Sequence, residues 1–555
     1  MPRPRAVIGG ATAALLLTLG ACAPVEDTGS DGDTTAEPTQ GGSLTLSLSA
    51  EVNNWNILHA TGDVFDYRQA LGPVYPHASY TTPEFTLEAD SNLVEKVEVT
   101  SEDPLEVTYT LRDAAVWSDG TPISADDFRY TWQVQDPDQC EECQPASTAG
   151  YDRIGSVEAG ADDRTVVITF DEPFQGWRTL FPHLLPAHIA EENGDLAESF
   201  NDYFVNTIPE WSGGPFQIKE YVGGQSLTLE ANPEWYGPGP LLDELIIRFI
   251  TEDEQAVTAL SNNEVQAISP RPSVDGMEQL EAMSHVTVET GPGLNYEHID
   301  FNVAKPGLDD PALRQAILTA IDREGIVRRT VGAVFPDAEP VGSRFIMPGQ
   351  EIEGIEGYVD STADLGLGSG DVDAAREILE GAGYEVDAGG LIDPDGEPVR
   401  DLTITSTRGN AMRTETMVLV QSNLEPLGIT VVPTYTDDLG GTVRGGDFDI
   451  ILFGTNLDII PTRTAQSQFS SATGFTNYQD EEIDQWLDEA QTTLDPQVVV
   501  ENLQAVDARL SEEAVTLPLF QMPTVAATAD GVQNVGVNGT RSGITYNANE
   551  WAVLD

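Results

Sequence analysis

The chain has 555 residues, with 26 lysines and arginines against 93 aspartates and glutamates, so its formal net charge at pH 7 is −67. Such a charge repels the phosphates of DNA and RNA and argues against a nucleic-acid-binding role. The acids are dispersed among ordinary amphipathic segments, which indicates a hydrated surface that stays soluble in salt. A chain of this length exceeds one hydrophobic core, so two or more lobes are expected.

The N-terminal segment has the pattern of a secretory signal. Arg3 and Arg5 form a basic start, and the apolar run from residue 11 to residue 19 is too short to span a bilayer. The small residues before Cys22 make this segment similar to a bacterial lipobox, in which the cysteine receives diacylglycerol and becomes the new N-terminus. Residues 22–42 lack apolar periodicity and aromatic residues, which predicts a flexible tether.

The stretch WSDGTPISADDFRYTW (residues 117–132) combines aspartates with aromatic residues, as a glycosidase site would. A structural interpretation accounts for it better. Asp119-Gly120 is a turn after an alternating strand, and Ser124 with Asp127 resembles a capping box that opens a helix. Phe128 and Trp132 would share the core-facing side of that helix. We therefore predict strand, turn and capped helix, without chemistry.

Two further cysteines, Cys140 and Cys143, lie in the polar segment DPDQCEECQPAS. In an oxidising compartment a local disulfide is the first interpretation. Zinc would need about four ligands, and the glutamates between the sulfurs disfavour a catalytic pair. His183 and His188 are separated by Pro186 and have no third ligand nearby, so we predict no metal site and no cofactor.

Farther along the chain, strands and helices alternate. The segments FQIKEYV and SLTLEAN flank Gly223-Gly224, which predicts a β-hairpin. The run LDELIIRFI predicts a buried strand, and DEQAVTALSNNEVQAI predicts a helix after it. Another helix begins at Asp310, an N-cap residue followed by Pro311 at the first helical position.

The segments LTITSTRGN, AMRTETMVLVQSNLEPLG and ITVVPTYT predict a strand–helix–strand unit, and GDFDIILFGTNLDIIP adds another buried strand. The fold class is therefore α/β. Ligands of open α/β sheets bind beyond the carboxyl ends of strands. This rule favours Arg408 after one strand, and Asn456 and Asp458 after the other.

Several of these segments occur in the order seen in one family. They are YTLRDAAVWSDGTPISADDFRYTW, GGPFQIKEYVGGQSLTLEANPEWYG, FNVAKPGLDDPALRQAILTAIDREGIV, AAREILEGAGY and EPLGITV. They resemble the extracytoplasmic solute-binding proteins of family 5, the oligopeptide- and dipeptide-binding subunits of ATP-binding-cassette (ABC) importers. The resemblance extends from about residue 42 to the C-terminus.

The resemblance implies a two-lobed periplasmic-binding-protein-like fold (type II, cluster C-like) with a hinged cleft and an extra inserted β-rich domain. Lobe closure would be a hinge motion that a ligand stabilises by touching both sides. The expected divisions are a signal peptide (1–21), a lipidated tether (22–42), a discontinuous lobe I (43–75, 208–296 and 511–555), an inserted domain (76–207) and lobe II (297–510).

The resemblance also implies site residues. Peptide-binding relatives hold the α-amino group of the ligand with an aspartate that matches Asp458, and a carboxylate in a poorly solvated cleft suits an ammonium group. We expect Asn456 near this position. Trp55, in the loop after the first strand, is a candidate for stacking on the ligand, and Arg408 for pairing with a carboxylate. Core packing for Trp55, and pairing with acids of the chain for Arg408, are open alternatives.

The expected function is that of a lipid-anchored, monomeric receptor on the extracytoplasmic face of a bacterial membrane. It would capture an oligopeptide- or dipeptide-like solute and deliver it to ABC permease subunits and their ATPases, with no enzymatic activity. One alternative is a receptor for an oligosaccharide, an opine or a metal chelate. Another is a secreted hydrolase, because two catalytic carboxylates among 93 acids leave no signature.

Overall fold

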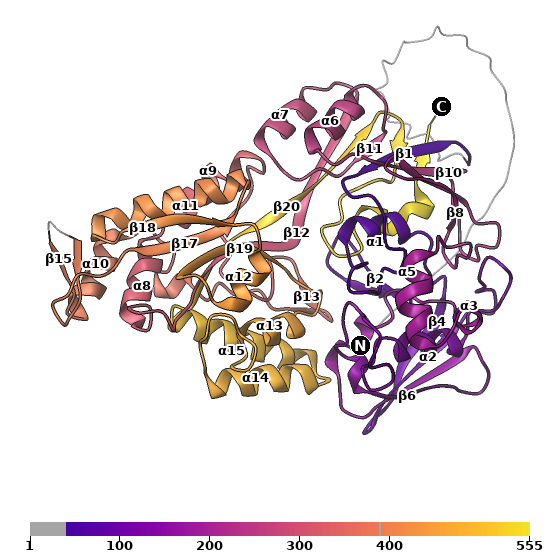
Figure 1. Ribbon diagram of the computed structural model, residues 1–555, viewed down its shortest axis with the longest axis horizontal. Coiled ribbons are helices and arrows are strands. Elements are labelled where there is room, and N and C mark those ends of the chain that lie inside the picture. The colour runs from indigo at the N-terminus through magenta and orange to yellow at the C-terminus, as the bar shows by residue number, and fades with distance from the viewer. Residues whose placement is uncertain (1–39, 388–389, 555) are drawn as a thin grey trace, which may run out of the picture. The chain divides into compact units, whose positions relative to one another are not determined.

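The computed structural model describes residues 40–387 and 390–554. The predicted signal peptide, the lipidation site at Cys22 and most of the predicted tether lie outside these residues. Within the described part of the chain, no helix is both long and apolar enough to cross a membrane. The architecture is α/β, as the sequence predicts, and it is organised around one large mixed sheet (Figure 1).

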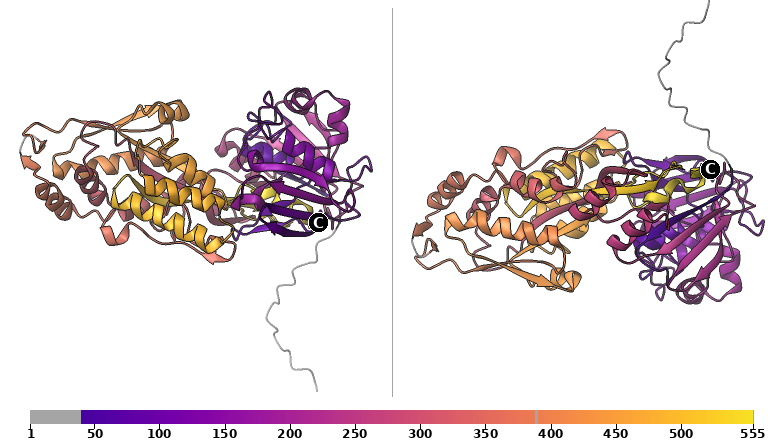
Figure 2. Two further views of the ribbon diagram at one scale, coloured as in Figure 1. Left: turned by 90° about the horizontal axis from the view of Figure 1, so that it is seen from below. Right: turned by 90° about the horizontal axis from the view of Figure 1, so that it is seen from above.

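The large sheet has ten strands in the order β18-β17-β19-β12-β20-β11-β1-β10-β9-β8. Its two longest strands, β12 and β20, pair antiparallel with each other and join the two halves of the sheet (Figures 1 and 2). In sheet order the strands are β18 (Val431–Thr436), β17 (Leu402–Thr407), β19 (Ile450–Asn456), β12 (Val286–Phe301), β20 (Thr516–Ala529), β11 (Ala267–Ile268), β1 (Ser43–Leu48), β10 (Glu244–Phe249), β9 (Ser226–Ala231) and β8 (Phe216–Val222).

One half of the sheet contains β1, which runs parallel to both β10 and β11. The strands β8 and β9 form the predicted antiparallel hairpin around Gly223-Gly224. The predicted helix after β10 is shorter than expected: α6 (Asp253–Ser261) ends early, and Ala267–Ile268 form β11. The helix ends shortly before Asn263, which adopts a left-handed φ of 56°. The next helix is α7 (Val274–Glu281).

A separate antiparallel sheet has the order β4-β5-β7-β6. Its strands are β4 (Val94–Glu102), β5 (Leu105–Leu111), β7 (Thr165–Phe170) and β6 (Ile154–Ala159). Helix α2 (Ala125–Gln133) follows the predicted turn and begins with the predicted capping box of Ser124 and Asp127. Phe128 is fully buried and Trp132 is 5 % exposed, so the predicted capped helix and its core-facing side are confirmed. Nearby helices are α1 (Phe65–Leu71), α3 (Ala187–Glu192), α4 (Leu196–Glu198) and α5 (Phe204–Asn206).

The other half of the large sheet contains the predicted strand–helix–strand unit, β17, α11 (Ala411–Leu424) and β18, whose strands pair in parallel. Helix α8 (Pro311–Ala320) begins at Asp310, whose side chain accepts a hydrogen bond from the Ala312 amide. The remaining helices are α9 (Arg323–Arg329), α10 (Val372–Gly381), α12 (Leu439–Gly445), α13 (Thr462–Phe469), α14 (Glu481–Thr492) and α15 (Pro496–Glu512). Short hairpins complete the fold: β2 (Ser79–Thr81) with β3 (Leu87–Ala89), β13 (Glu351–Ile352) with β14 (Ile355–Glu356), β15 (Glu385–Asp387) with β16 (Gly390–Ile392), and β21 (Val532–Gln533) with β22 (Ala552–Val553).

Buried side chains form separate cores in the two halves. One continuous core contains Leu46 of β1 together with Val107 of β5, so the four-stranded sheet packs with the first half of the large sheet. A second core contains Ile404 of β17 and Leu452 of β19. A third lies among α13, α14 and α15. The domain boundaries given above stay a prediction.

Candidate functional site

A cavity of about 570 Å³ is lined by residues from both halves of the chain. Its walls come from α1 and the β2–β3 region, from the loops around residues 146 and 180, from the connection between β19 and α13, and from residues 540–550. This volume lies in the range typical of small-molecule sites. Segments distant in sequence thus meet at one place that is large enough for a solute.

Three arginines and two aspartates form a charged cluster in the cavity lining, here called the arginine cluster (Arg68, Arg463, Arg541, Asp63 and Asp458). Arg463 donates from Nε and Nη2 to Asp458 Oδ2, at 3.2 Å and 2.6 Å. Arg541 lies between the two acids, with Nη1 3.4 Å from Asp458 Oδ1 and Nη2 3.5 Å from Asp63 Oδ2. Arg68 Nε is 2.5 Å from Asp63 Oδ1. Guanidinium groups therefore exceed carboxylates by one.

The local fold places these side chains. Asp63 lies just before α1 and Arg68 in its last turn, whereas Asp458 lies in the connection after β19 and Arg463 at the start of α13. Arg541 comes from the C-terminal segment, which lies close against β12. A Cβ atom on Gly539 would stand only 2.4 Å from the carbonyl oxygen of a β12 residue, so this approach requires glycine.

The electrostatics of the cluster favour ionised carboxylates. Burial opposes ionisation of Asp63, but the charges of Arg68, Arg541 and Arg463 and the hydrogen bond from Arg68 outweigh it, so the pKa of Asp63 lies below its ordinary value. Asp63 therefore stays ionised at neutral pH, and the cluster holds three guanidinium groups against two carboxyl groups. The arrangement can accept one further carboxylate without creating a net negative group.

Histidines and further acids complete the cavity lining. His77 Nε2 lies 3.5 Å from Asp90 Oδ2, and the ring of His183 lies 6.4 Å from that of His77. Burial, followed by the charges of Arg68 and His77, holds the pKa of His183 well below its ordinary value, so this imidazole stays neutral. Glu550 also lines the cavity. Among the residues that the structure describes, no group of three or more His, Cys, Asp or Glu side chains could hold a metal ion.

Of the predicted ligand-binding residues, Asp458 lines the cavity. Its carboxylate is already engaged by two guanidinium groups, however, and the ammonium-anchor role expected from the resemblance would require it to face a cation of the solute. The cause is Arg463, which lies five residues further on at the start of α13 and reaches back to Asp458.

The other three predicted residues are not in the cavity lining. Asn456 accepts a 2.6 Å hydrogen bond from Asn295 of the neighbouring strand. Trp55 is 5 % exposed and packs edge-to-face on Tyr221. Arg408 is exposed and pairs with Asp437 at 3.1 Å. These positions match the core-packing and acid-pairing alternatives for Trp55 and Arg408.

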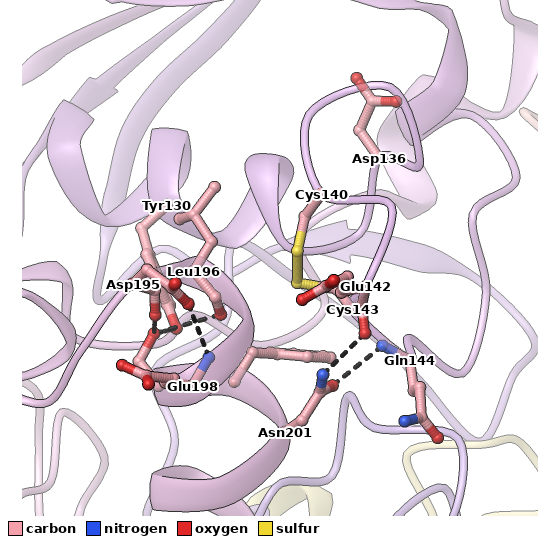
Figure 3. The surroundings of a disulfide bond; sticks show 12 residues. Tyr130, Asp136, Cys140, Glu142, Cys143, Gln144, Asp195, Leu196, Glu198 and Asn201 are labelled. Carbon is pink, nitrogen blue, oxygen red and sulfur yellow. Dashed lines mark hydrogen bonds between the residues drawn. A yellow bond between two sulfur atoms is a disulfide. The ribbon is translucent and has the colours of Figure 1, made fainter.

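The predicted cysteine pair forms a disulfide in the structure (Figure 3). Sequence reasoning missed Arg68, Arg463 and Arg541. Basic residues are rare in this chain, with only 26 among 555 residues, so the presence of three of them in one cavity indicates a binding site. That signal becomes visible only once the fold brings residues 68, 463 and 541 together.

Comparisons with known proteins agree with this architecture. The family model described as bacterial extracellular solute-binding proteins, family 5 Middle, matches residues 88–477. The chain is 30 % identical over 515 residues to the oligopeptide-binding protein OppA of Mycobacterium tuberculosis, covering 90 % of this chain and 83 % of OppA. The chain belongs to this family.

Solved structures of the family share the fold. The periplasmic EDTA-binding protein EppA superposes with a TM-score of 0.88 at 34 % identity, covering 94 % of this chain and 98 % of EppA. The oligopeptide-binding protein AppA of Bacillus subtilis, in complex with a nonapeptide, superposes with a TM-score of 0.73 at 22 % identity, covering 94 % and 100 %. The predicted two-lobed periplasmic-binding-protein-like fold is therefore confirmed. The chain is a solute-binding protein of the family that serves ABC importers.

Proposed function

We propose that this family 5 protein is the substrate-binding subunit of an ABC importer and that it captures a small solute carrying carboxylate groups. The observation that carries the proposal is the arginine cluster, in which Asp458 is already paired and one guanidinium charge remains for the solute. The 34 % identity to the EDTA-binding protein EppA supports the same class, since EDTA is a polycarboxylate.

The remaining hydrogen-bonding capacity of Arg463 fits this class. A guanidinium has five N–H donors. Among the described residues, Arg463 uses Nε and one donor of Nη2 on Asp458, and one donor of Nη1 on Ser147. One donor therefore remains on each terminal nitrogen, which matches the two oxygens of a carboxylate. Arg541 is 51 % exposed at its side chain and is available to the same ligand.

The net charge of the chain constrains how such a solute arrives. At physiological ionic strength the Debye length is about 8 Å, so the many surface acids are screened from an approaching anion, while contacts within the cavity are not. We therefore expect the association rate of an anionic solute to rise with salt, which is opposite to the usual behaviour of oppositely charged partners. A surface with a formal charge of −67 thus suits an anion receptor only in a saline medium.

An oligopeptide is the second candidate solute. The 30 % identity to OppA over most of the chain favours it. Its C-terminal carboxylate or an acidic side chain would bind the arginine cluster. Its ammonium group would then have to meet Asp90 or Glu550, which also line the cavity, and would not meet Asp458.

Lipid anchoring through Cys22 and delivery to a permease complete the proposal. The lipobox-like segment supports anchoring on the extracytoplasmic face, and the family supports delivery to permease subunits and their ATPases. We further propose that the protein acts as a monomer and catalyses no reaction. Radiolabelled palmitate incorporation into the wild type, lost in Cys22→Ala, would test the anchor.

The test of the solute class begins with protein that has been unfolded and refolded to remove any bound solute. Titration calorimetry then compares EDTA, Mg-EDTA and citrate with a mixed peptide pool, using the wild type, Arg463→Gln and the control Arg408→Gln. Binding of a polycarboxylate that is lost in Arg463→Gln and kept in Arg408→Gln supports the proposal. Binding of peptides without any polycarboxylate would select the second candidate, and binding of neither anionic class would overturn the role of the cluster.

A further inference from the structure

The disulfide lies in the same loop as part of the cavity wall. The connection between α2 and β6 contains Cys140 and Cys143, and a few residues later Ala146, Ser147 and Ala149 line the cavity. Cys143 is 9 % exposed and belongs to the first core, with Cys140 packed against it. The disulfide therefore ties the loop to that core just before the chain reaches the cavity wall.

Hydrogen bonds continue from the disulfide to the cavity wall. The Asn201 side chain donates to the carbonyl of Glu142 at 2.8 Å and accepts from the amide of Gln144 at 2.9 Å (Figure 3). The amide of Ala60 donates to the carbonyl of Gln144, and the amide of Ala146 donates to the carbonyl of Leu58, each at 2.8 Å. Residues 142–146 are thus held along their length, and Ser147 follows directly.

Ser147 contacts the arginine cluster. Its Oγ accepts a 2.7 Å hydrogen bond from Nη1 of Arg463, while Asp458 holds the Nε and Nη2 edge of the same guanidinium. The two contacts fix the plane of the guanidinium from two directions. A rigid guanidinium loses less freedom when it binds a carboxylate, and this preorganisation raises affinity.

The loop that contains the disulfide is rich in acidic residues. Four acids, Asp136, Asp138, Glu141 and Glu142, stand close in sequence to the two cysteines. Burial raises the pKa of Asp136, and the charges of Asp138 and Asp152 raise it further, while a hydrogen bond from the Asp138 amide acts in the opposite direction. A disulfide between residues three apart closes a short loop and restricts the unfolded chain little, so its main effect is local order in the folded state.

We propose that the Cys140–Cys143 disulfide is a positioning device for solute binding: it holds Ser147 in place and, through Ser147, fixes the guanidinium of Arg463. The effect on affinity rests on the proposed function, whereas the effect on loop order does not. Cys140, Cys143 and Ser147 are positioning residues in this scheme, and Arg463 is the residue that touches the solute.

The first experiment measures loop order in solute-free protein by amide hydrogen exchange. In Cys140→Ser/Cys143→Ser, the amides of Gln144, Ala146 and Ala149 should exchange at least about tenfold faster, while amides of β17 and β18 keep their rates. Asn201→Ala, which loosens the same loop with the disulfide intact, should accelerate the same amides. Unchanged exchange at these amides in Cys140→Ser/Cys143→Ser would overturn the proposal whatever the solute is, and faster exchange in Asn201→Ala alone would assign the order of the loop to the hydrogen bonds of Asn201.

The second experiment is a double-mutant cycle with Mg-EDTA as the probe, measured by calorimetry. Ser147→Ala should weaken binding about tenfold, in line with the loss of one hydrogen bond to a charged group. Cys140→Ser/Cys143→Ser should weaken it similarly, and the triple variant should be no weaker than Ser147→Ala alone. A purely structural role of the disulfide would instead make the losses multiply to about a hundredfold, which would contradict the proposal.

The two experiments separate the proposals. If the wild type binds neither EDTA nor Mg-EDTA, the proposed solute class is wrong, and the exchange experiment still decides whether the disulfide orders Ser147. If the wild type binds the probe and the cycle is additive, the solute class stands and the positioning role is wrong.

Discussion

Two arginine–aspartate pairs show how one chemical pair serves two purposes in this molecule. Arg344 and Asp507 are 0 % and 4 % exposed at their side chains, with Nη1 2.7 Å from Oδ1, whereas Arg463 and Asp458 are 39 % and 19 % exposed, with Nη2 2.6 Å from Oδ2. Arg344 also donates to the carbonyl of Thr516 at 2.6 Å. The first pair is almost completely buried, whereas the second is partly exposed and lies in the lining of the 570 Å³ cavity. Exposure to the cavity, and not the ion pair itself, identifies a binding group.

The largest effect should come from breaking the enclosed pair. Asp507→Asn leaves the guanidinium of Arg344 buried without its counter-charge, and we expect the free energy of unfolding to fall by about 3–5 kcal/mol. Urea denaturation of the solute-free protein measures this. The exposed pair of Arg328 and Glu324 supplies the control, because Glu324→Gln should change stability by less than about 0.5 kcal/mol. Equal free energies of unfolding for Asp507→Asn and Glu324→Gln would contradict the stabilising role given to the buried pair.

Breaking the Arg463–Asp458 pair should lower the affinity for the solute and leave the stability of the fold nearly unchanged. Arg463→Gln removes the donors that face the solute, and we expect affinity for a polycarboxylate to fall about a hundredfold, or about 2.7 kcal/mol. Calorimetry measures the affinity and urea denaturation the stability, which should stay within about 1 kcal/mol because the group is partly exposed. A large loss of stability without loss of affinity would make this pair structural, like the first.

His183 sharpens the comparison, because it is buried in the cavity lining and its Nδ1 has no hydrogen-bond partner within the described residues. Since burial lowers its folded pKa, the unfolded chain binds a proton near pH 6.5 that the folded chain does not. The free energy of unfolding therefore falls as pH drops below about 6.5, by about 1.4 kcal/mol per pH unit from this residue. Denaturation of wild type and His183→Gln at pH 7.5, 6.0 and 5.0 should give curves that converge on acidification. Parallel curves would show that this imidazole takes up a proton in the folded protein as readily as in the unfolded chain.

The smallest effect is expected for an exposed arginine outside the cavity. Arg408 pairs with Asp437 and lies over the ring of Tyr435, away from the cavity lining. Arg408→Gln should change both affinity for a polycarboxylate and stability by less than about 0.5 kcal/mol. A loss of affinity comparable to that of Arg463→Gln would place the solute outside the cavity and contradict the distinction between cavity-facing and other ion pairs.

Local chemistry made much of the fold predictable. The Ser124–Asp127 capping box, the Gly223-Gly224 hairpin and the start of α8 after Asp310 each depend on neighbours in sequence, and each is present in the structure. The helix after β10 was predicted too long. Its last residues pair instead with β1 and β20, strands whose positions a local pattern does not contain.

The candidate site was only partly predictable. The rule that ligands bind beyond the carboxyl ends of strands led to Asp458, which lines the cavity, and to Arg408, which does not. The rule names the edge of a sheet, and it says nothing about which side chains at that edge turn toward the same space. Nor does the rule show that a basic neighbour, Arg463, already forms an ion pair with the carboxylate of Asp458.

The sequence by itself determined the family, the α/β class and the local elements, because these follow from patterns within a few dozen residues and from segments in a fixed order. Only the tertiary structure decided the charge that a solute would meet. Arg68 is separated along the chain from both Arg463 and Arg541 by almost four hundred residues or more, and the three charges act together only where α1, α13 and the C-terminal segment converge. Electrostatic interaction depends on distance in space, and distance along the chain does not determine it.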